Sequence, residues 1–353
     1  MKTLRLKVDA ENLGTPEALE ALARAAEILR GGGLVAFPTE TVYGLGANAL
    51  DKAAVERIFE AKSRPAWDPV IVHVASQAML DGLVKQIPET ALKLMEAFWP
   101  GPLTLLLKRT QAVPDAVTAG RPLVGVRMPA HPVALELIRR AGVPVAAPSA
   151  NRFGHVSPTT AGHVLDDLDG RIDAIVDAGP TMRGVESTVL DAMARPMMIY
   201  RPGAVTAEQI MEIVGPVEVF RSGPIPEICE TPTEGLPSPG VGIKHYAPRA
   251  RLVLVEGRRE EIGKRLAEAA CTERGERLGV MLPDGIAAAQ EIAGAEIYAW
   301  GRWDEPETLA QGLYAGLRAL DAAGCTVILC PLPQMEGIGA AIRDRLLKAG
   351  SRD

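Results

Sequence analysis

The chain has 353 residues, which at roughly 150 residues per domain corresponds to about two domains. Hydrophobic residues make up 47% of it and charged residues 23%, so the composition excludes a disordered chain and a coiled-coil rod. The formal net charge of -6 argues against a dedicated nucleic-acid binder, and any basic site must therefore be local.

The first 215 residues alternate apolar strand candidates with amphipathic helix candidates at uneven spacing. We expect strands at residues 34–37, 70–74, 103–107, 123–128, 143–147, 174–178, 187–190 and 197–200, and helices at 18–29, 52–61, 88–97, 132–141 and 206–213. Many strands with unequal helix spacing predict an α/β domain built on a large, twisted, mixed sheet.

A stretch rich in proline and glycine follows this region, with six Pro and four Gly between residues 222 and 249. Such a composition is typical of a domain boundary. We place the first domain at residues 1–215, a linker at 216–249 and a second domain at 250–353.

The second domain alternates strands and helices regularly. Strands are expected at 252–255, 278–282, 296–300 and 326–330, and helices at 258–270, 285–293, 305–322 and 338–349. This alternation predicts right-handed crossovers and a smaller, parallel, Rossmann-like α/β sheet.

Polar segments follow several predicted strands of the first domain, where open α/β sheets usually bind ligands. The segment from Pro38 to Gly46, PTETVYGLG, crowds hydroxyls and a carboxylate at a strand end. A tight turn with threonine caps is the alternative interpretation. The GLGANA stretch fits a dinucleotide fingerprint only weakly, because six residues separate Phe37 from Gly44.

Four cations lie at predicted element ends. Lys62 and Arg64 flank a helix end before a proline, and Arg201 follows a strand before another proline. Fixed cations suit a polyphosphate, although the helix dipole would also explain the first two. Arg127 follows apolar strand residues, and its burial would require either a protein carboxylate or a substrate carboxylate as partner.

Several well-known catalytic and metal-binding motifs are missing, which limits the reactions that this sequence could catalyse. A Walker A loop, a GxSxG elbow, an HExxH helix and CxxC pairs are absent from the sequence. Cations and hydroxyls together fit transfer at a phosphate by positioning and charge stabilisation. Unpaired cysteines and the lack of a long apolar run predict a cytoplasmic protein.

Seven ordered motifs resemble the YrdC-type domain of the threonylcarbamoyl-AMP synthase family: PTETVYGLG, KSRP with the following IVH, FWPGPLT, VRMPAHP, APSAN, GVESTV and RPG. The segment SPGVGIKHYAP and the tail resemble the two-domain branch of that family. The resemblance implies an ATP-dependent nucleotidyltransferase that makes threonylcarbamoyl-AMP and pyrophosphate from L-threonine, bicarbonate and ATP. Mg²⁺ would accompany ATP, and a separate transferase would pass the product's threonylcarbamoyl group to tRNA.

The resemblance also assigns residues to the two substrates. Those for threonine are Thr39, His73, Arg127, Ala147 and Ser187, and those for ATP are Lys62, Arg64, Ser149, Asn151, Ser157, Arg201 and Tyr246. It implies no metal ligands from the protein and no side-chain nucleophile. His73 is the best-placed candidate for a general base, although a lone strand histidine is more often a core residue.

Two positions depart from the family pattern. Asp68 stands where the family usually has asparagine, which adds a negative charge near a phosphate site. Val241, Gly242 and Ile243 replace a stretch that usually carries a lysine and a tyrosine. We still expect the linker to close over the nucleotide as a lid, through Lys244, His245 and Tyr246.

Two other functions stay open at this point. One is a non-catalytic RNA-binding module, which the acidic balance and the lack of an RNP-like aromatic motif disfavour. The other is a YrdC-type carbamoyltransferase, which would carry additional zinc-binding regions, whereas this sequence has no CxxC pairs. Neither a membrane partner nor stable nucleic-acid binding is expected.

Overall fold

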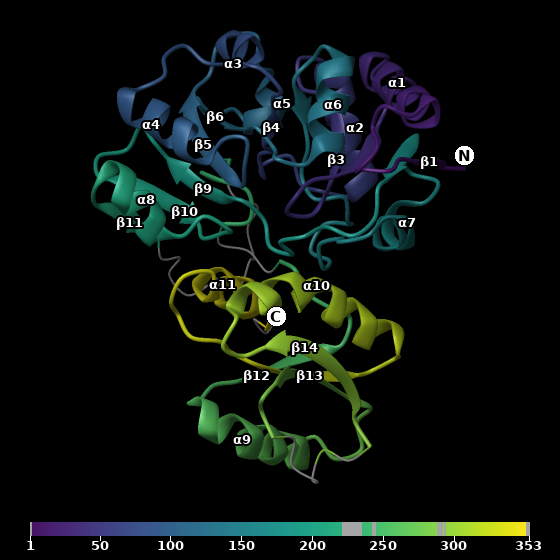
Figure 1. Ribbon diagram of the computed structural model, residues 1–353, viewed down its shortest axis with the longest axis vertical. Helices are drawn as coiled ribbons and strands as arrows, with labels where there is room; N and C mark the ends of the chain where they lie inside the picture. The colour runs from purple at the N-terminus through teal and green to yellow at the C-terminus, as the bar shows by residue number, and fades with distance from the viewer. Residues whose placement is uncertain (1, 221–234, 242–244, 288–291, 293, 351–353) are drawn as a thin grey trace. The chain divides into compact units, whose positions relative to one another are not determined.

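The computed structural model describes residues 2–220, 235–241, 245–287, 292 and 294–350. The chain divides into two compact units (Figure 1). The first comprises Met1–Phe153, Ser157–Met182 and Glu186–Gly242, and the second comprises Gly154–Val156, Arg183–Val185 and Ile243–Asp353. Among the described residues, no helix is long and apolar enough to cross a membrane.

The described part of the first unit contains an 11-stranded sheet in the order β1-β8-β2-β3-β7-β4-β6-β5-β9-β10-β11. Its strands are β1 (Leu4–Lys7), β2 (Val35–Pro38), β3 (Tyr43–Asn48), β4 (Val72–His73), β5 (Leu103–Lys108), β6 (Leu123–Arg127), β7 (Val145–Ala146), β8 (Ala174–Asp177), β9 (Thr188–Asp191), β10 (Met197–Arg201) and β11 (Val217–Val219). Strand β4 runs parallel to β6 and antiparallel to β7. The predicted large mixed sheet is therefore confirmed.

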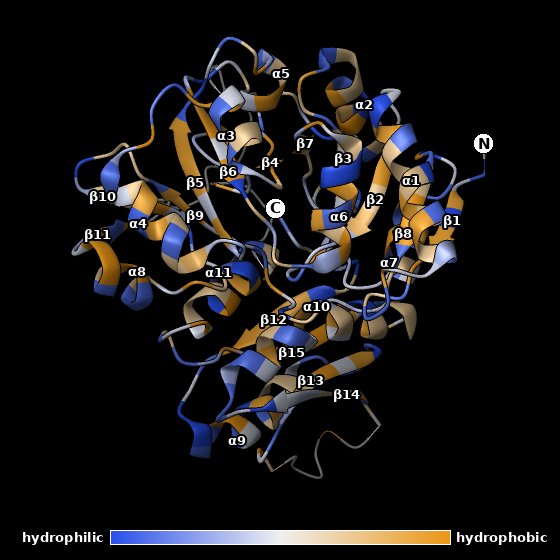
Figure 2. Cartoon of the chain, turned by 45° about the horizontal axis from the view of Figure 1, so that its top comes forward, coloured by the Kyte–Doolittle hydropathy of each residue, from blue (hydrophilic) through white to orange (hydrophobic). Residues whose placement is uncertain are grey.

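Helices cover both faces of this sheet. They are α1 (Pro16–Arg30), α2 (Lys52–Lys62), α3 (Gln77–Leu83), α4 (Glu89–Phe98), α5 (Asp115–Thr118), α6 (Pro132–Ala141), α7 (Ala161–Leu168) and α8 (Ala207–Val214). Alternate side chains along β2 enter different cores: Val35 and Phe37 join the cluster under α1 and α6, whereas Ala36 joins the larger one. This two-sided burial explains the mostly apolar colour of strands such as β2 and β5 (Figure 2).

Strand β3 occupies part of the segment that the sequence presents as a polar loop. It pairs antiparallel with β2, so that Phe37 lies opposite Gly44. A Cβ atom at Gly46 would come within 2.8 Å of both the Phe37 ring and the Val145 side chain. Glycine here lets a neighbouring aromatic ring pack on the strand, which a sequence pattern does not reveal. Elements β1, α3, α5 and α7 were also not predicted, and β11 lies within the segment predicted as linker.

The second unit contains a four-stranded sheet in the order β12-β15-β13-β14, with every pairing parallel. Its strands are β12 (Arg251–Val255), β13 (Leu278–Asp284), β14 (Glu296–Arg302) and β15 (Val327–Pro331), and its helices are α9 (Arg259–Thr272), α10 (Pro306–Ala322) and α11 (Gly339–Gly350). The predicted small parallel sheet is confirmed. Of the helix predicted at 285–293, residues 288–291 and 293 lie outside the described residues.

Candidate active site

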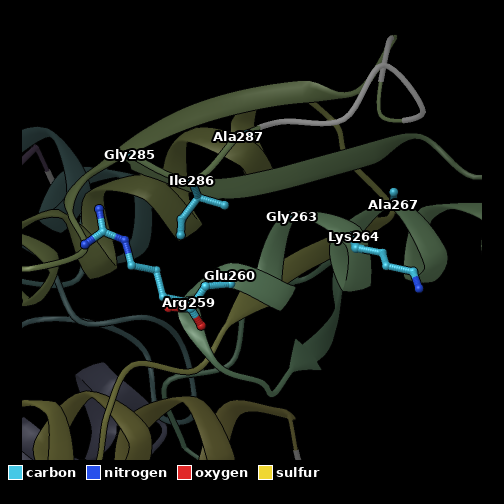
Figure 3. Close-up of a pocket in the computed structure, with 8 residues that line it drawn as sticks. All are labelled: Arg259, Glu260, Gly263, Lys264, Ala267, Gly285, Ile286 and Ala287. Atoms are coloured by element: carbon cyan, nitrogen blue, oxygen red, sulfur yellow. The ribbon is translucent and has the colours of Figure 1, made fainter.

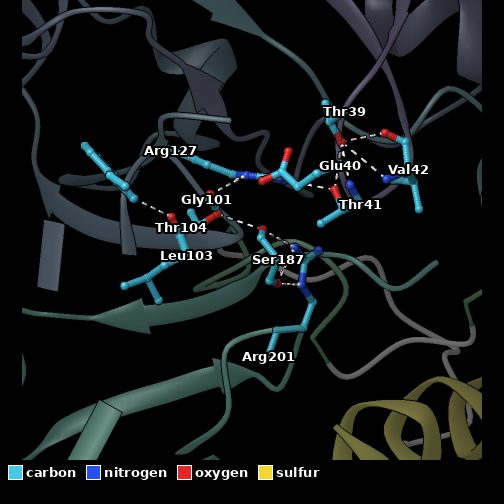
Figure 4. Close-up of polar contacts among 11 residues, drawn as sticks. Thr39, Glu40, Thr41, Val42, Gly101, Leu103, Thr104, Arg127, Ser187 and Arg201 are labelled. Carbon is cyan, nitrogen blue, oxygen red and sulfur yellow. Dashed lines mark hydrogen bonds and ion pairs between the residues drawn. The ribbon is translucent and has the colours of Figure 1, made fainter. Parts of the chain in front are cut away.

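The turn between β2 and β3 holds a cluster of buried hydroxyls beside Arg127 (Figure 4). The Thr39 hydroxyl accepts hydrogen bonds from the amides of Thr41 and Val42, which closes the turn locally. From β6, Arg127 donates Nη1 to the Thr41 hydroxyl at 3.1 Å. The turn that the sequence predicts and the candidate carboxylate-binding arginine therefore belong to one polar cluster.

Arg127 pairs with a carboxylate of the protein itself. Its Nη2 lies 2.6 Å from Glu40 Oε1, and both side chains are only 4% exposed. Its Nε donates to the Gly101 carbonyl at 3.1 Å. Burial tends to raise the pKa of Glu40, but the charge and hydrogen bond of Arg127 outweigh it and lower that pKa overall. Of the two partners left open for Arg127, the structure provides the protein carboxylate.

Ser187 links the candidate threonine residues to a candidate ATP residue. Its hydroxyl lies 2.8 Å from the Thr104 hydroxyl on β5. Arg201, the last residue of β10, donates Nη2 to both the carbonyl and the hydroxyl of Ser187, at 3.0 and 3.1 Å. Because these contacts are direct, the groups assigned to the two substrates adjoin one another.

Lys62 and Arg64 are brought together by the residue between them. Lys62 ends α2, and Ser63 caps the helix with φ 53°, in the left-handed region. Two residues apart on a regular helix, Lys62 and Arg64 would point in nearly opposite directions. Here both cations are buried, and the charge of each lowers the pKa of Asp68, so the left-handed turn keeps both of them near this carboxylate.

Lys62 supports the APSAN segment. Its Nζ donates to the Ser149 carbonyl at 2.6 Å and also to the carbonyl of Asn151. Burial, and then the nearby charge of Arg64, hold the pKa of Lys62 well below its usual range. Three of the residues predicted for ATP are thus in direct contact.

Arg64 is held by the turn that follows it. Its Nε and Nη2 donate to the carbonyls of Asp68 and Pro69, at 3.1 and 2.7 Å. Its Nη2 also lies 2.8 Å from the Asp68 carboxylate, which is completely buried. Burial raises the pKa of Asp68, although Arg64 opposes this effect. The ring of Phe153 lies 6.0 Å from the guanidinium.

His73 is a core side chain on β4. It is 4% exposed, and its ring meets that of Phe37 edge-on at 6.4 Å. Burial and the charge of Arg127 lower its pKa to about 3, so the imidazole is neutral at physiological pH and is a weak base. Ala147 lies beside the segment that leads into His73, because its amide donates a hydrogen bond to the Ile71 carbonyl at 2.8 Å.

The remaining predicted ATP residues are distributed between the two units. In the first, the buried Ser157 hydroxyl donates to Glu186 at 2.6 Å. In the second, Tyr246 has φ 64°, stacks on Tyr314 with a ring separation of 5.9 Å, and lies under Arg345. Lys244, which we expected in the lid, falls outside the described residues. The proposed closure of the linker over ATP stays a prediction.

A separate pocket of about 750 Å³ lies in the second unit (Figure 3). One face of α9 and residues 285–287 line it, and its charged side chains are Arg259, Glu260 and Lys264. Arg259 also pairs with Asp304 at 2.5 Å. None of the residues predicted for threonine or ATP lines this pocket.

Three carboxylates that accompany these groups were not assigned to the site from the sequence. Glu40 pairs with Arg127, Asp68 with Arg64, and Glu186 with Ser157. Glu40 lies inside the PTET segment, and the requirement that a buried Arg127 find an anion is the signal that points to it. Asp68 stood out only as a departure from the family pattern.

Two family models together cover most of the chain. One, described as "Telomere recombination" (Sua5, YciO and YrdC), matches residues 27–203, and the other, described as "Threonylcarbamoyl-AMP synthase, C-terminal domain", matches residues 205–351. A threonylcarbamoyl-AMP synthase of Pyrococcus abyssi is 44% identical over 92% of this chain and 92% of its own length. The chain belongs to the threonylcarbamoyl-AMP synthase family.

Further members of this family are similar to this chain over nearly its whole length. A threonylcarbamoyl-AMP synthase of Bacillus subtilis is 45% identical over 99% of this chain and 98% of its own. A solved structure of Pyrococcus abyssi Sua5 complexed with L-threonine superimposes with a TM-score of 0.87 at 41% identity, covering 99% of this chain and 98% of that one. The resemblance found in the seven sequence motifs, and with it the two-part α/β fold, is confirmed.

Proposed function

We propose that this chain is an L-threonylcarbamoyladenylate synthase, an ATP-dependent nucleotidyltransferase that uses L-threonine and bicarbonate and releases pyrophosphate. The contact between Arg201 and Ser187 carries the proposal, because it joins a candidate phosphate cation to a candidate threonine hydroxyl. The names of the curated relatives and the threonine complex of the solved relative support the same conclusion.

The reaction would proceed in two bond-forming steps. The α-amine of threonine attacks the carbon of bicarbonate, and loss of water leaves an N-carboxylate, the carbamate. A carbamate oxygen then attacks the α-phosphorus of ATP, and the bond to the bridging oxygen of pyrophosphate breaks. The products are threonylcarbamoyl-AMP and pyrophosphate, and the protein's contribution is to align the reactants and to stabilise charge.

The cations divide between the two substrates in this scheme. Lys62, Arg64 and Arg201 would bind the triphosphate and stabilise the leaving pyrophosphate, since all three act on the charge of one buried point, Asp68. Arg127, with Thr39 and Ser187, would hold threonine. Because Glu40 already pairs with Arg127, the threonine carboxylate would join an existing ion pair rather than neutralise an isolated cation.

The proposed reaction also implies a metal ion, an acceptor for the product and a cellular compartment. Mg²⁺ is proposed to accompany ATP, bound chiefly by phosphate oxygens, since the side chains at this site are mostly cations and hydroxyls. The product would pass to a transferase that modifies tRNA. A reducing, cytoplasmic setting is supported by the free thiols of Cys271, Cys325 and Cys330.

An assay of pyrophosphate release tests the proposal. The protein is incubated with ATP and Mg²⁺, with threonine and bicarbonate added separately and together, and pyrophosphate is expected only when both are present. Arg64→Ala should lower the rate roughly 100-fold or more, because a fixed cation at the phosphates is lost. Arg24→Ala on the exposed face of α1 is the matched control and should keep the wild-type rate. Pyrophosphate release that ignores threonine would refute the proposal.

A further inference from the structure

Part of the linker is docked on the first unit. We call residues 235–241 the strap. Arg121 Nη1 donates to the Gly235 carbonyl at 2.7 Å, and the Leu236 amide donates to the Trp67 carbonyl at 2.9 Å. Ser238 is completely buried, and Val241 is 5% exposed. The strap is therefore held at its start by two hydrogen bonds and is buried toward its end.

The strap ends at the buried carboxylate of Asp68. The Gly240 amide is close enough to this carboxylate to favour its charged form, which lowers the pKa of Asp68. The same carboxylate lies 2.8 Å from Arg64 Nη2. One side chain is thus close to both the strap and the arginine that we assign to the nucleotide.

The strap and Arg64 also both bind the turn at residues 65–69. Its Trp67 carbonyl accepts the strap's Leu236 amide, and its Asp68 and Pro69 carbonyls accept the Nε and Nη2 hydrogens of Arg64. The strap and the guanidinium are consequently bound to the same short turn. Loss of the strap would remove one of the contacts that hold this turn, and with it part of the support for the direction of Arg64.

We propose that Asp68 is a positioning residue that couples docking of the strap to the orientation of Arg64, so that strap docking and nucleotide binding favour each other. The inference rests on the proposed role of Arg64 in binding ATP. A guanidinium fixed at two of its nitrogens before the ligand arrives loses less conformational freedom on binding. By reciprocity, a nucleotide that requires this orientation stabilises the docked strap.

A double-mutant cycle tests the coupling, with the dissociation constant of a non-hydrolysable ATP analogue measured by calorimetry. Arg121→Gln removes the strap's first anchor without touching Arg64, and it should weaken analogue binding roughly fivefold or more. In an Asp68→Asn background the same Arg121→Gln change should leave the dissociation constant unaltered. Arg139→Gln, on an exposed arginine of α6, and Asp81→Asn, on an exposed aspartate of α3, are the matched controls and should bind as wild type does.

Hydrogen exchange of the strap amides gives a readout that does not depend on activity. The analogue should slow exchange at Leu236 and Gly240 in the wild type, and this protection should vanish in Asp68→Asn. Equal affinity in Arg121→Gln and wild type, or losses that simply add, would overturn the coupling. If the wild type fails to bind the analogue, the proposed function fails. Unchanged strap exchange in nucleotide-free Asp68→Asn would instead contradict the role of Asp68 alone.

Discussion

Two buried carboxylate–guanidinium pairs lie in the first unit, and they differ in an instructive way. Glu40 and Arg127 approach to 2.6 Å, and Asp68 and Arg64 to 2.8 Å, with all four side chains nearly inaccessible. The pKa of Glu40 is nevertheless lowered, whereas that of Asp68 is raised. Distance between opposite charges therefore does not by itself decide the direction in which the pKa of a buried acid is shifted.

The difference lies in where the arginine hydrogens go. Arg127 donates Nε and Nη1 to the Gly101 carbonyl and the Thr41 hydroxyl, which leaves its Nη2, 2.6 Å from Glu40 Oε1, to this carboxylate. Arg64 donates its Nε and Nη2 hydrogens to the backbone carbonyls of Asp68 and Pro69, so the Asp68 carboxylate gains mainly a charge interaction. An ion pair offsets the cost of burying its two charges only when the contact between them is close and undivided. The Nη2 group of Arg64 is divided between the Asp68 carboxylate and the Pro69 carbonyl, whereas that of Arg127 faces Glu40.

Arg127→Leu should produce the largest effect. It leaves Glu40 buried without its counter-ion, and breaking a buried pair in this way costs about 3–5 kcal/mol of unfolding free energy. Urea denaturation at pH 7, followed by circular dichroism, measures it. The loss of unfolding free energy should be smaller in acid, because a protonated Glu40 carries no charge for Arg127 to neutralise. A loss below about 1 kcal/mol at pH 7 would contradict a charged, arginine-dependent Glu40.

Glu40→Gln should have an intermediate effect, about 2 kcal/mol at pH 7, since a hydrogen bond to a charged group is replaced by a weaker neutral one. The folded-state pKa of Glu40 lies below its ordinary value of 4.5. Its stabilisation is therefore present above that value and is lost as the pH falls through the lowered pKa. Urea melts between pH 2 and 7 should show the wild type and the variant converging in acid. A constant gap would assign the loss to packing instead.

Asp68→Asn should have the smallest effect on stability at pH 7, smaller than that of Glu40→Gln, because the cost of burying the Asp68 charge already offsets part of what its pairing with Arg64 contributes. The folded-state pKa of Asp68 is raised above 3.8, so ionisation disfavours the folded state as the pH rises through that range. The variant escapes this penalty and should gain on the wild type from acid to neutral pH. A loss as large as that of Glu40→Gln would remove the distinction between the two pairs.

Much of the fold could be predicted from the sequence, because strand and helix periodicity are local signals. The parallel sheet of the second unit and the mixed sheet of the first followed from such patterns. Strand β3 could not, since its polar lead and the glycines Gly44 and Gly46 are typical of a loop. Only the Phe37 ring and the Val145 side chain in the neighbouring strands explain why glycine is required at 46.

The cations of the candidate site could be predicted from the sequence, but the carboxylates that pair with them could not. Lys62, Arg64 and Arg201 stand at element ends that the sequence marks with prolines and helix signals. The partner of Arg127 lies 87 positions earlier in the chain, at Glu40, in the turn that follows β2. Three strands separate β2 from β6 in the sheet, so the contact is made by the turn and not by neighbouring strands. Pairing between distant segments depends on register, which no short motif encodes.

The backbone conformation of Ser63 has a stereochemical consequence for how the KSRP motif works. Its φ of 53° reverses the handedness of the chain for one residue, and this reversal allows two cations that are two residues apart to lie near the same carboxylate, Asp68. A glycine at this position would keep the geometry without strain, whereas a valine would resist it, because branched L-residues rarely adopt this conformation. The charge of the motif would be unchanged in both variants. Comparing the two variants would therefore show whether the motif needs only its two positive charges or also the direction in which the backbone at residue 63 points them.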